Sequence, residues 1–331
     1  MLQIEKFSNI IETAPLVSII IPCYNYGQYI EKCIQSVLDQ TYERIEVVVV
    51  DNGSTDNSLE KINLFSGDNR VTIIKFSENI PPSDSNNRSL VYEAAINKSR
   101  GEYIGILYAD DWLIETKIEK QVELFRNSPN SVGVVYCHGY RYIESTDMFV
   151  KWKMQSVRGY VFKDYLERGD VVIPISPLVK RYCYDIIGLN NCWTGSEYDF
   201  FIMSQYVDFD FVDEHLVVMR DHDNNDAKNI FSVYQRVKLY HTTALLSLNT
   251  KLRAGNLINK RMARDYFSFG LGFVSKMDMI HGREALLETV KIRLIYIFKL
   301  KFIIAFTLSI LPVSISKFFL DRKNLIDIFF R

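Results

Sequence analysis

The stretch Ile45-Glu-Val-Val-Val-Val50-Asp51-Asn52-Gly53-Ser54-Thr55-Asp56 decides the fold of this 331-residue chain. Its first part, Ile45 to Val50, is rich in β-branched residues and apolar enough to be a strand buried on both faces of a parallel sheet. A second run of this kind spans Val17 to Ile21. Between the two runs, apolar residues recur with the spacing of one helix face, namely Ile30, Cys33, Ile34, Val37 and Leu38. The two strands and the helix between them predict a right-handed crossover unit.

The same alternation continues after this unit. Ser54 or Thr55 can cap a helix that runs to about Phe65, residues 71–76 are predicted as a strand, and residues 87–98 as a helix. Another strand follows at 103–107. Alternating strands and helices of these lengths predict an α/β fold with a doubly wound sheet, whose ligands bind beyond the carboxyl ends of the strands.

Composition excludes several classes of protein. Hydrophobic residues make up 48% and charged residues 24%, which is ordinary for a folded protein and argues against both disorder and a polytopic membrane protein. The net charge of -1 argues against nucleic-acid binding as the main activity. Five scattered cysteines indicate neither a disulfide framework nor a zinc site, and the first residues do not read as a secretory signal, so we expect a cytoplasmic protein.

Polar motifs follow two of the predicted strands. Asp51-Asn52-Gly53-Ser54-Thr55-Asp56 combines a strand-end carboxylate, a glycine for a tight turn and a helix N-terminus, which suits a nucleotide. Asp110 and Asp111 are adjacent carboxylates that repel each other unless a divalent cation compensates them, which suits a metal-diphosphate site. Taken alone, the first motif also fits a capped turn, and the second also fits a solvated helix cap.

Together these motifs resemble a known family. In order and spacing, Pro22-Cys23-Tyr24-Asn25, then Val50 to Asp56, then Gly101-Glu102-Tyr103 with Ala109-Asp110-Asp111 look like the inverting glycosyltransferases of family 2. The resemblance covers roughly residues 15–225 and implies a GT-A-like, Rossmann-like sheet that binds a nucleotide sugar. It further implies that Pro22, Tyr24, Asn25 and Asp51 hold the nucleotide, that Asp110 lies near the ribose, and that Asp111 ligates Mn²⁺ or Mg²⁺ on the diphosphate. Tyr108 stands where many members have an acid.

A third segment supplies the candidate base. An inverting transfer needs one carboxylate to take the proton of the acceptor hydroxyl. Glu197 resembles the second acid of the pair that opens a helix in the family, Ser196 replaces the first, and Asp199 is the alternative base. Residues two apart on a helix point about 200° apart, so Glu197 and Asp199 cannot both enter one cleft. The competing interpretation is that Ser196 caps the helix and both acids merely complement its dipole.

A fourth segment adds phosphate and metal contacts. Met219-Arg220-Asp221-His222 through Asn225 resembles a segment of many family members in which a histidine lies near the diphosphate. The resemblance implies that His222 is a metal ligand and Arg220 a diphosphate contact, while a histidine in a polar surface loop is the alternative. Residues 79–87 depart from the family pattern, and we expect Arg88 to bind the donor in place of the usual residues of that segment.

The chain ends in a region of different character. Beyond residue 225 the pattern becomes helical, and we expect residues 226–331 to form a helical extension of the catalytic domain at 15–225. Residues 291–323 hold seven basic residues against one acidic residue, and Phe302 to Ser316 is uncharged but shorter than the about 20 residues that span a bilayer. This composition predicts peripheral contact with anionic lipid on the inner face of the cell membrane. A helical cap on the core or an oligomer interface are the alternatives.

The predicted function combines these parts. The resemblance implies an enzyme that moves a sugar from a nucleoside-diphosphate sugar, UDP-sugar favoured, to a glycan or lipid-linked oligosaccharide in capsule or O-antigen synthesis. A catalytically silent donor-binding or scaffold subunit is the alternative, motivated by Tyr108 and Ser196. A sugar nucleotidyltransferase fits less well, because a glycine-rich basic loop is missing after the first strand.

Overall fold

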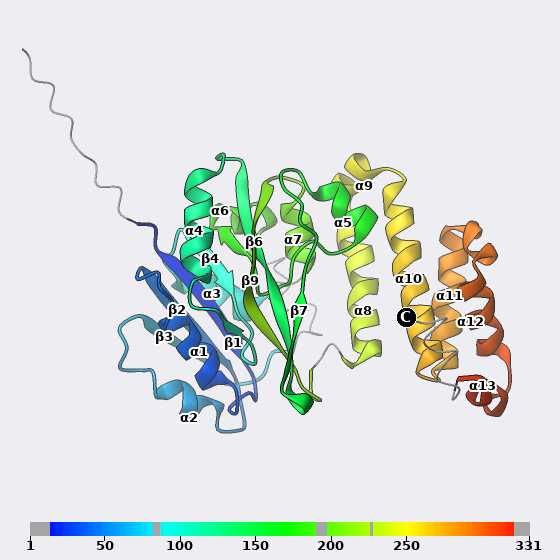
Figure 1. Cartoon of the computed structure of the whole chain (residues 1–331), viewed down its shortest axis with the longest axis horizontal. Coiled ribbons are helices and arrows are strands. Elements are labelled where there is room, and N and C mark those ends of the chain that lie inside the picture. Colours follow the sequence, from blue (N-terminus) through cyan, green and yellow to red (C-terminus); the bar gives the residue numbers. More distant parts are fainter. Residues whose placement is uncertain (1–13, 82–86, 88, 190–196, 226–227, 321–331) are drawn as a thin grey trace, which may run out of the picture.

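The computed structural model describes residues 14–81, 87, 89–189, 197–225 and 228–320. A mixed sheet with helices on its faces forms one part of the molecule, and a group of C-terminal helices lies against its side (Figure 1). The predicted α/β fold with a helical C-terminal region is confirmed.

The first half of the sheet is parallel. Its strand order is β3 (Val71–Phe76), β2 (Ile45–Asn52), β1 (Val17–Cys23) and β4 (Tyr103–Ile106). All eight residues of β2 are buried, as expected for a strand in the middle of a parallel sheet. The four strands expected in this part are therefore confirmed, and each lies within a residue or two of its predicted bounds.

Helices cover both faces of this parallel half. Helix α1 (Ile30–Leu38) packs against alternate residues of β1 such as Ile19 and Ile21, whereas α3 (Leu90–Lys98) packs with Ile20 on the other face. Successive residues of a strand point to opposite faces, so one strand serves two cores. The sheet is doubly wound here, as its alternating pattern predicts.

The second half of the sheet is mixed. The strand order continues from β4 through β8 (Leu178–Lys180), β6 (Val132–Ile143) and β9 (Asp208–Asp221) to β5 (Trp112–Leu113), and β7 (Met148–Trp152) pairs with β6. The helical elements of this half are α4 (Lys117–Asn127), η1 (Glu144–Thr146), α5 (Phe162–Arg168), α6 (Tyr182–Ile187) and α7 (Glu197–Met203). Strand β9 is 14 residues long, and its last residues reach the carboxyl end of β4.

The helix predicted at 87–98 begins at Leu90, and two other local helix signals are not realised as expected. Helix α2 (Ser58–Asn63) begins after the residues expected to cap it, because Ser54 Oγ accepts a hydrogen bond from the Asn25 N–H and the Thr55 N–H donates to Asn25 Oδ1. Asp110 and Asp111 do not cap a helix, because Trp112 and Leu113 pair with β9 as strand β5 and α4 begins only at Lys117. In both places a tertiary contact displaces the local helix signal.

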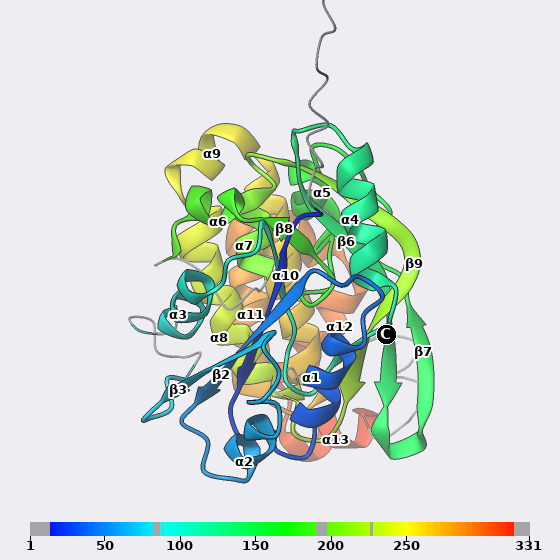
Figure 2. The ribbon, with the colours of Figure 1, turned by 90° about the vertical axis from the view of Figure 1, so that its left-hand side faces the viewer.

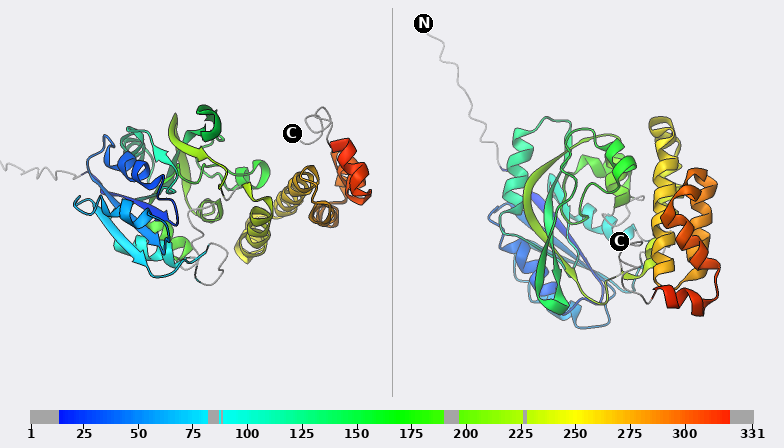
Figure 3. Two further views of the ribbon diagram at one scale, coloured as in Figure 1. Left: turned by 90° about the horizontal axis from the view of Figure 1, so that it is seen from below. Right: turned by 45° about the vertical axis from the view of Figure 1, so that its right-hand side comes forward.

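The C-terminal region is helical throughout its described part. Its elements are α8 (Ile230–Tyr240), η4 (His241–Leu245), α9 (Leu248–Ala254), α10 (Leu257–Ser275), α11 (Met279–Ile292), η5 (Leu294–Phe298), α12 (Leu300–Ile310) and α13 (Val313–Leu320). Helices α10 and α11 approach closely, since a Cβ on Gly270 would lie 2.7 Å from Leu286. Helix α8 faces the sheet and α12 lies outermost (Figure 3). No helix in the described ranges is both long and apolar enough to cross a membrane.

A buried ionic network joins these helices to the sheet domain. Arg261 of α10 donates to Asp265 Oδ2 at 2.8 Å, to the Tyr165 carbonyl at 2.7 Å and to Asp170 Oδ1 at 3.2 Å. The ring of His241 lies 3.0 Å from the same oxygen of Asp265. Burial opposes the ionisation of Asp265, but the charge of Arg261 and the contact with His241 outweigh it and hold the pKa of Asp265 below its ordinary value. This network is therefore charged and paired, and it fixes α10 against α5.

Candidate functional site

The predicted site residues gather at one edge of the sheet. Strands β1 and β2 are in register so that Cys23 pairs with Asp51, and Leu107, just after β4, donates to the carbonyl of Ile20. The carboxyl ends of β1, β2 and β4 are therefore neighbours, at the lower end of the molecule in Figure 2. The end of β9 reaches the same place, because the Arg220 N–H donates to Asp111 Oδ1 at 2.8 Å.

The loops after β1 and β2 form a tight cradle. Asn25 has a φ of 57°, and its Oδ1 accepts from the N–H groups of Thr55 and Asp56 at 2.8 and 3.3 Å. Gly53 has a φ of 70°, and a Cβ there would lie 2.5 Å from the backbone of Glu78, so only glycine fits. The predicted nucleotide residue Asn25 thus already uses its side-chain oxygen to join the two loops.

Asp51 lies at the base of this cradle and is 1% exposed. Its Oδ1 accepts a long bond from the Ser54 N–H at 3.4 Å, whereas its Oδ2 is buried without a partner among the described residues. A buried carboxylate oxygen without a donor is costly, so it favours a ligand that brings an N–H group. Pro22 and Tyr24 lie beside it, and the ring of Tyr24 is 38% exposed.

The acid pair after β4 is buried, and the effect of burial outweighs the nearby charge of Arg220. Asp110 and Asp111 are 8% and 3% exposed. Burial raises the pKa of Asp110, and burial together with the charge of Asp110 raises the pKa of Asp111 well above its ordinary value. The pair is therefore unfavourable as two anions unless a cation compensates it.

His222 and Asn225 hold Asp110 in place. The ring of His222 lies with its Nε2 3.1 Å from Asp110 Oδ2, and Asn225 Nδ2 donates to the same oxygen at 3.3 Å. The His222 N–H in turn donates to Asn225 Oδ1, which fixes the loop after β9. His222 is 5% exposed and packs on the ring of Tyr29, so it is part of the site rather than a histidine in a polar surface loop.

The guanidinium of Arg220 is enclosed by the protein. It donates through Nε to the carbonyl of Asp110 at 3.0 Å and through Nη1 to Glu144 Oε1 at 2.9 Å, and it lies 4.4 Å from the ring centroid of Tyr29. Its side chain is only 10% exposed. In this arrangement Arg220 positions the acid pair, and its predicted contact with a diphosphate stays a prediction.

Glu144 is a site residue that sequence reasoning missed. It comes from η1 at the tip of the β6–β7 hairpin, and it accepts from both Arg220 and the Tyr29 hydroxyl, the latter at 2.9 Å. No local motif marks Glu144, because its partners are 76 and 115 residues away in the sequence.

The acid pair fits a divalent cation. Among the described residues, no group of three His, Cys, Asp or Glu side chains has the arrangement of a complete metal site. Mg²⁺ and similar ions in nucleotide enzymes are commonly held by only one or two carboxylates plus phosphate oxygens and water. Asp110 and Asp111 supply such carboxylates, and because burial raises the pKa of both, a bound cation would favour their charged forms. His222 is at hand, but it contacts Asp110 here.

The predicted base is only partly described. Glu197 is the first residue of α7, and its side chain, like Arg88 and Ser196, lies outside what the structure describes. The alternative base Asp199 is 0% exposed, but Asp51 and Asp111 are nearly as buried, so burial does not decide between Asp199 and Glu197. The choice of Glu197 as the base stays a prediction.

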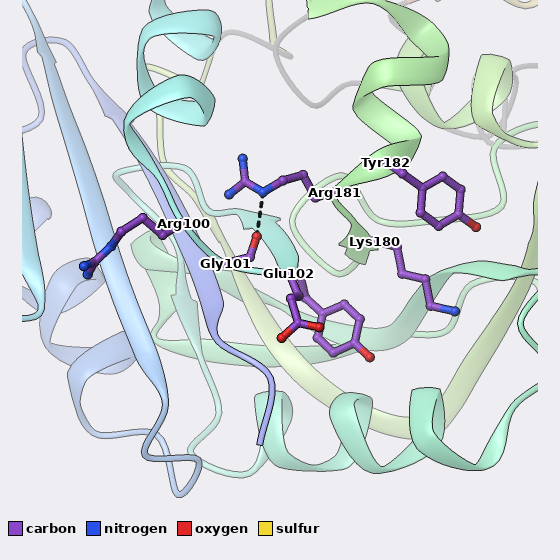
Figure 4. Close-up of a pocket in the computed structure, with 7 residues that line it drawn as sticks. Arg100, Gly101, Glu102, Lys180, Arg181 and Tyr182 are labelled. Carbon is purple, nitrogen blue, oxygen red and sulfur yellow. Dashed lines mark hydrogen bonds between the residues drawn. The ribbon is translucent and has the colours of Figure 1, made fainter. Parts of the chain in front are cut away.

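The cavity in Figure 4 lies at the opposite edge of the sheet. It has a volume of about 350 Å³ and is lined by residues that precede β4 or end β8. Arg181 donates to the carbonyl of Gly101 at 2.6 Å, and Arg100 turns away to pair with Glu46. These cations are occupied in holding loops, and parallel strands bind ligands at their carboxyl ends, so this cavity is not the predicted site.

Comparisons with known proteins identify similar families and folds. Residues 18–171 match the model of glycosyl transferase family 2. Glycosyltransferase GlyG of Streptococcus pneumoniae serotype 4 is 30% identical over 189 residues, which is 53% of this chain and 60% of that protein. The chain thus spans less than two thirds of the length of that curated relative.

Solved structures share the fold. TarS 1–349 of S. aureus in complex with UDP has a TM-score of 0.60 at 15% identity and covers 84% of this chain and 81% of its own. The mannosyltransferase PcManGT of Pyrobaculum calidifontis in complex with GDP-Man and Mn²⁺ has a TM-score of 0.58 at 14% identity, over 96% and 88%. At this identity the similarity concerns the fold alone.

Proposed function

The chain belongs to glycosyltransferase family 2 and has the GT-A fold, and from this premise we propose that it is an inverting, metal-dependent glycosyltransferase. Its donor is a nucleoside-diphosphate sugar, with UDP favoured over other nucleotides. The observation that carries the proposal is the buried pair Asp110–Asp111 with raised pKa values at the carboxyl end of β4. Such a pair calls for a cation at the place where a GT-A sheet binds its diphosphate.

Each residue has a role in the proposed reaction. Bound Mn²⁺ or Mg²⁺ would stabilise the negative charge of the departing nucleoside diphosphate. Asp110 and Asp111 would hold that cation, and Asp51 would accept an N–H of the base on Oδ2, which has no partner among the described residues. Glu197 takes the proton of the acceptor hydroxyl as its oxygen attacks the anomeric carbon from the face opposite the diphosphate. The configuration at that carbon is therefore inverted.

The acceptor and pathway complete the proposal. The acceptor is a glycan or lipid-linked oligosaccharide in capsule or O-antigen synthesis, on the inner face of the cell membrane. Residues 15–225 form the catalytic domain, and residues 226–331 form the helical, membrane-peripheral extension. TarS, whose complex contains UDP, supports the choice of donor nucleotide, and PcManGT, whose complex contains Mn²⁺, supports the choice of metal.

A transfer screen tests this function. Purified protein is incubated with a panel of nucleotide sugars, Mn²⁺ or Mg²⁺ and membrane-extract acceptors, and release of the nucleoside diphosphate is measured. We expect metal-dependent release from one donor, which Asp111→Ala and Glu197→Ala both abolish. Donor binding without turnover would instead favour the silent subunit, for which Tyr108 and Ser196 are the motive.

A further inference from the structure

The last helices contain an unusual stretch of charge. Residues 289–320 contain no Asp or Glu, although acidic residues are as frequent as basic ones in the whole chain. The basic residues of this stretch are Lys291, Arg293, Lys299, Lys301 and Lys317. All charged side chains of this stretch are therefore positive, although the net charge of the whole chain is -1.

Helix α12 exposes an apolar side within this stretch. Phe302, Ala305 and Leu308 are buried in the cluster that α12 forms with α10 and α11. The opposite side carries Leu300, Ile303 and Ile310, which are 62%, 49% and 56% exposed. These residues follow the spacing of one helix side, so α12 is apolar on both its inner and its outer side.

The neighbouring elements extend this side. Helix α13 is tied to α12 because Ser316 Oγ donates to the Leu308 carbonyl at 2.8 Å, and its remaining surface faces outward. Further large apolar residues are exposed on η5 and α13, namely Leu294, Ile295, Phe298, Val313, Ile315, Phe318 and Phe319. We call the exposed apolar residues of 294–319, with the basic residues among them, the acid-free face. So many exposed apolar side chains on neighbouring elements are typical of a surface that binds a partner.

Helix α13, the last part of the acid-free face, lies toward the end of the molecule that holds the site. Helix α13 and the tip of the β6–β7 hairpin, which carries Glu144, both lie at the lower end in Figures 1 and 2. The carboxyl ends of β1 and β2 point to this end as well. A flat partner that covers α13 would therefore lie near the end of the sheet that carries the acid pair.

We propose that the acid-free face docks on the surface of an anionic lipid bilayer. Apolar side chains enter the boundary of the acyl chains, and Lys299, Lys301 and Lys317 meet the phosphate groups around them. This partner alone suits both an apolar and an entirely basic surface, whereas a second copy would bring its own positive charge against it. The inference deepens the proposed function, because it presents the site to an acceptor embedded in the bilayer.

Vesicle sedimentation of the full chain tests the proposal. Binding is compared between vesicles of phosphatidylcholine alone and vesicles that also contain phosphatidylglycerol. We expect binding at least about tenfold tighter to the anionic vesicles, decreasing as salt is added. Equal binding to both kinds of vesicle, or none to either, would overturn the proposal. Sedimentation needs no turnover, so an inactive enzyme that binds vesicles refutes only the proposed function.

Matched variants locate the contact. Phe298→Glu with Leu300→Glu places two acids on the acid-free face, where the first residue of α12 tolerates an acid well. Leu248→Glu with Leu252→Glu is the control, because these α9 leucines are equally exposed at 72% and 77% but lie outside the face. We expect the first pair to weaken anionic binding at least about tenfold and the control to leave it unchanged.

A charge variant and a mass measurement exclude the alternatives. Lys299→Gln with Lys317→Gln keeps the apolar surface and removes two charges, and we expect it to lose the preference for phosphatidylglycerol while its thermal unfolding is unchanged. Light scattering on the same proteins measures oligomeric state. Membrane docking would be refuted if the wild-type protein is a dimer that does not bind vesicles and if Phe298→Glu with Leu300→Glu dissociates this dimer. That result would show that a second copy occupies the face.

Discussion

Two carboxylates with little exposure, Asp111 and Asp265, have pKa values that are shifted in opposite directions. Asp111 lies in the site and is 3% exposed as a whole residue. Asp265 lies at the interface between α10 and the sheet domain, and its side chain is 12% exposed. The pKa of Asp111 is raised by burial and by Asp110, whereas for Asp265 the charge of Arg261 outweighs burial and lowers the pKa. Similar burial thus gives opposite shifts, and the neighbouring charge decides the direction.

The difference separates a structural charge from a functional one. Arg261 and His241 surround Asp265, so the network is complete within the protein and holds two regions together. Asp111 has a backbone N–H and another acid beside it, so its charge is compensated only when something else binds. Unpaired buried charge in a cleft is a mark of a functional site.

Removal of the charge of Asp265 should have the largest effect on stability. Asp265→Asn leaves Arg261 buried without its main partner, and we expect a loss of about 3–5 kcal/mol in the free energy of unfolding by urea. The lowered pKa means that Asp265 stabilises the fold above its ordinary range and that this contribution is lost as the pH falls through the lowered value. The difference between variant and wild type should therefore shrink in acid.

An exposed pair is the control for this variant. Arg168 and Asp164 form an ion pair with i,i+4 spacing on α5, and the Arg168 side chain is 62% exposed. Arg168→Met should change the unfolding free energy by no more than about 0.5 kcal/mol. Similar losses for Asp265→Asn and Arg168→Met would mean that the Arg261 network does not hold the helices.

The same change at Asp111 should affect activity instead of stability. Asp111→Asn keeps the shape and the oxygen that accepts from the Arg220 N–H, but it removes the charge that the cation needs. We expect a loss of about 100- to 1000-fold in metal-dependent transfer, the size typical of losing one electrostatic stabiliser. Thermal unfolding without metal should be unchanged or shifted upward, because a repulsive charge is removed.

Added Mn²⁺ sharpens this comparison. With Mn²⁺ and nucleoside diphosphate present, wild type should unfold at a higher temperature than Asp111→Asn, since only wild type gains the bound cation. Destabilisation of metal-free protein by Asp111→Asn, to the extent seen for Asp265→Asn, would contradict the distinction between the two acids.

The sequence predicts the parts of the site whose signals are local. Asp51, Asp110 and Asp111 follow predicted strands, so their meeting at one sheet edge follows from the parallel order alone. Asp51 lies at the end of its strand as expected, and within the described ranges its Oδ2 has no hydrogen-bond partner. The alternation of strands and helices along the chain likewise predicts helices on both faces of the sheet.

Other features depend on contacts that no local pattern encodes. The first turn expected for α2 is absent because Asn25, about thirty residues earlier, takes the N–H groups that would begin it. The role of Arg220 depends on Glu144, which a hairpin brings from another part of the sheet. The pairing of Arg261 with Asp170 likewise joins two regions through a tertiary contact. Such long-range hydrogen bonds require the folded structure.

Lys117 tests whether unpaired buried charge always means function. It is 1% exposed at the start of α4, and its ammonium donates to Gln121 Oε1 at 2.8 Å. Burial lowers the pKa of Lys117 to about 8, so its protonated form destabilises the fold below that pH. Lys117→Met should raise the unfolding free energy by about 1–2 kcal/mol at pH 7 without loss of transfer activity.

The pH dependence identifies the cause. Because the pKa of Lys117 is lowered in the folded protein, the unfolded chain binds more protons than the folded chain between about pH 8 and the ordinary lysine pKa. The stability of the wild-type protein therefore increases with pH over that range. The advantage of Lys117→Met should therefore disappear near pH 10. Lys120→Met, on the same helix but paired at the surface with Glu214, is the control and should show no such change. Loss of transfer in Lys117→Met alone would give this lysine a function.

Glu144 should have the smallest effect, because it acts on the acid pair through Arg220. Glu144→Gln keeps a group that can accept from Arg220 and Tyr29 but removes the negative charge beside the guanidinium. We expect transfer to fall by about five- to tenfold, close to 1 kcal/mol, with a weaker apparent affinity for Mn²⁺, since the freed charge of Arg220 opposes the cation. Glu119→Gln, whose carboxylate bonds Thr41 away from the site, is the matched control. A change in stability with no change in Mn²⁺ affinity would mean that Glu144 only stabilises the hairpin. Arg220 could then contact the diphosphate instead of positioning the acid pair.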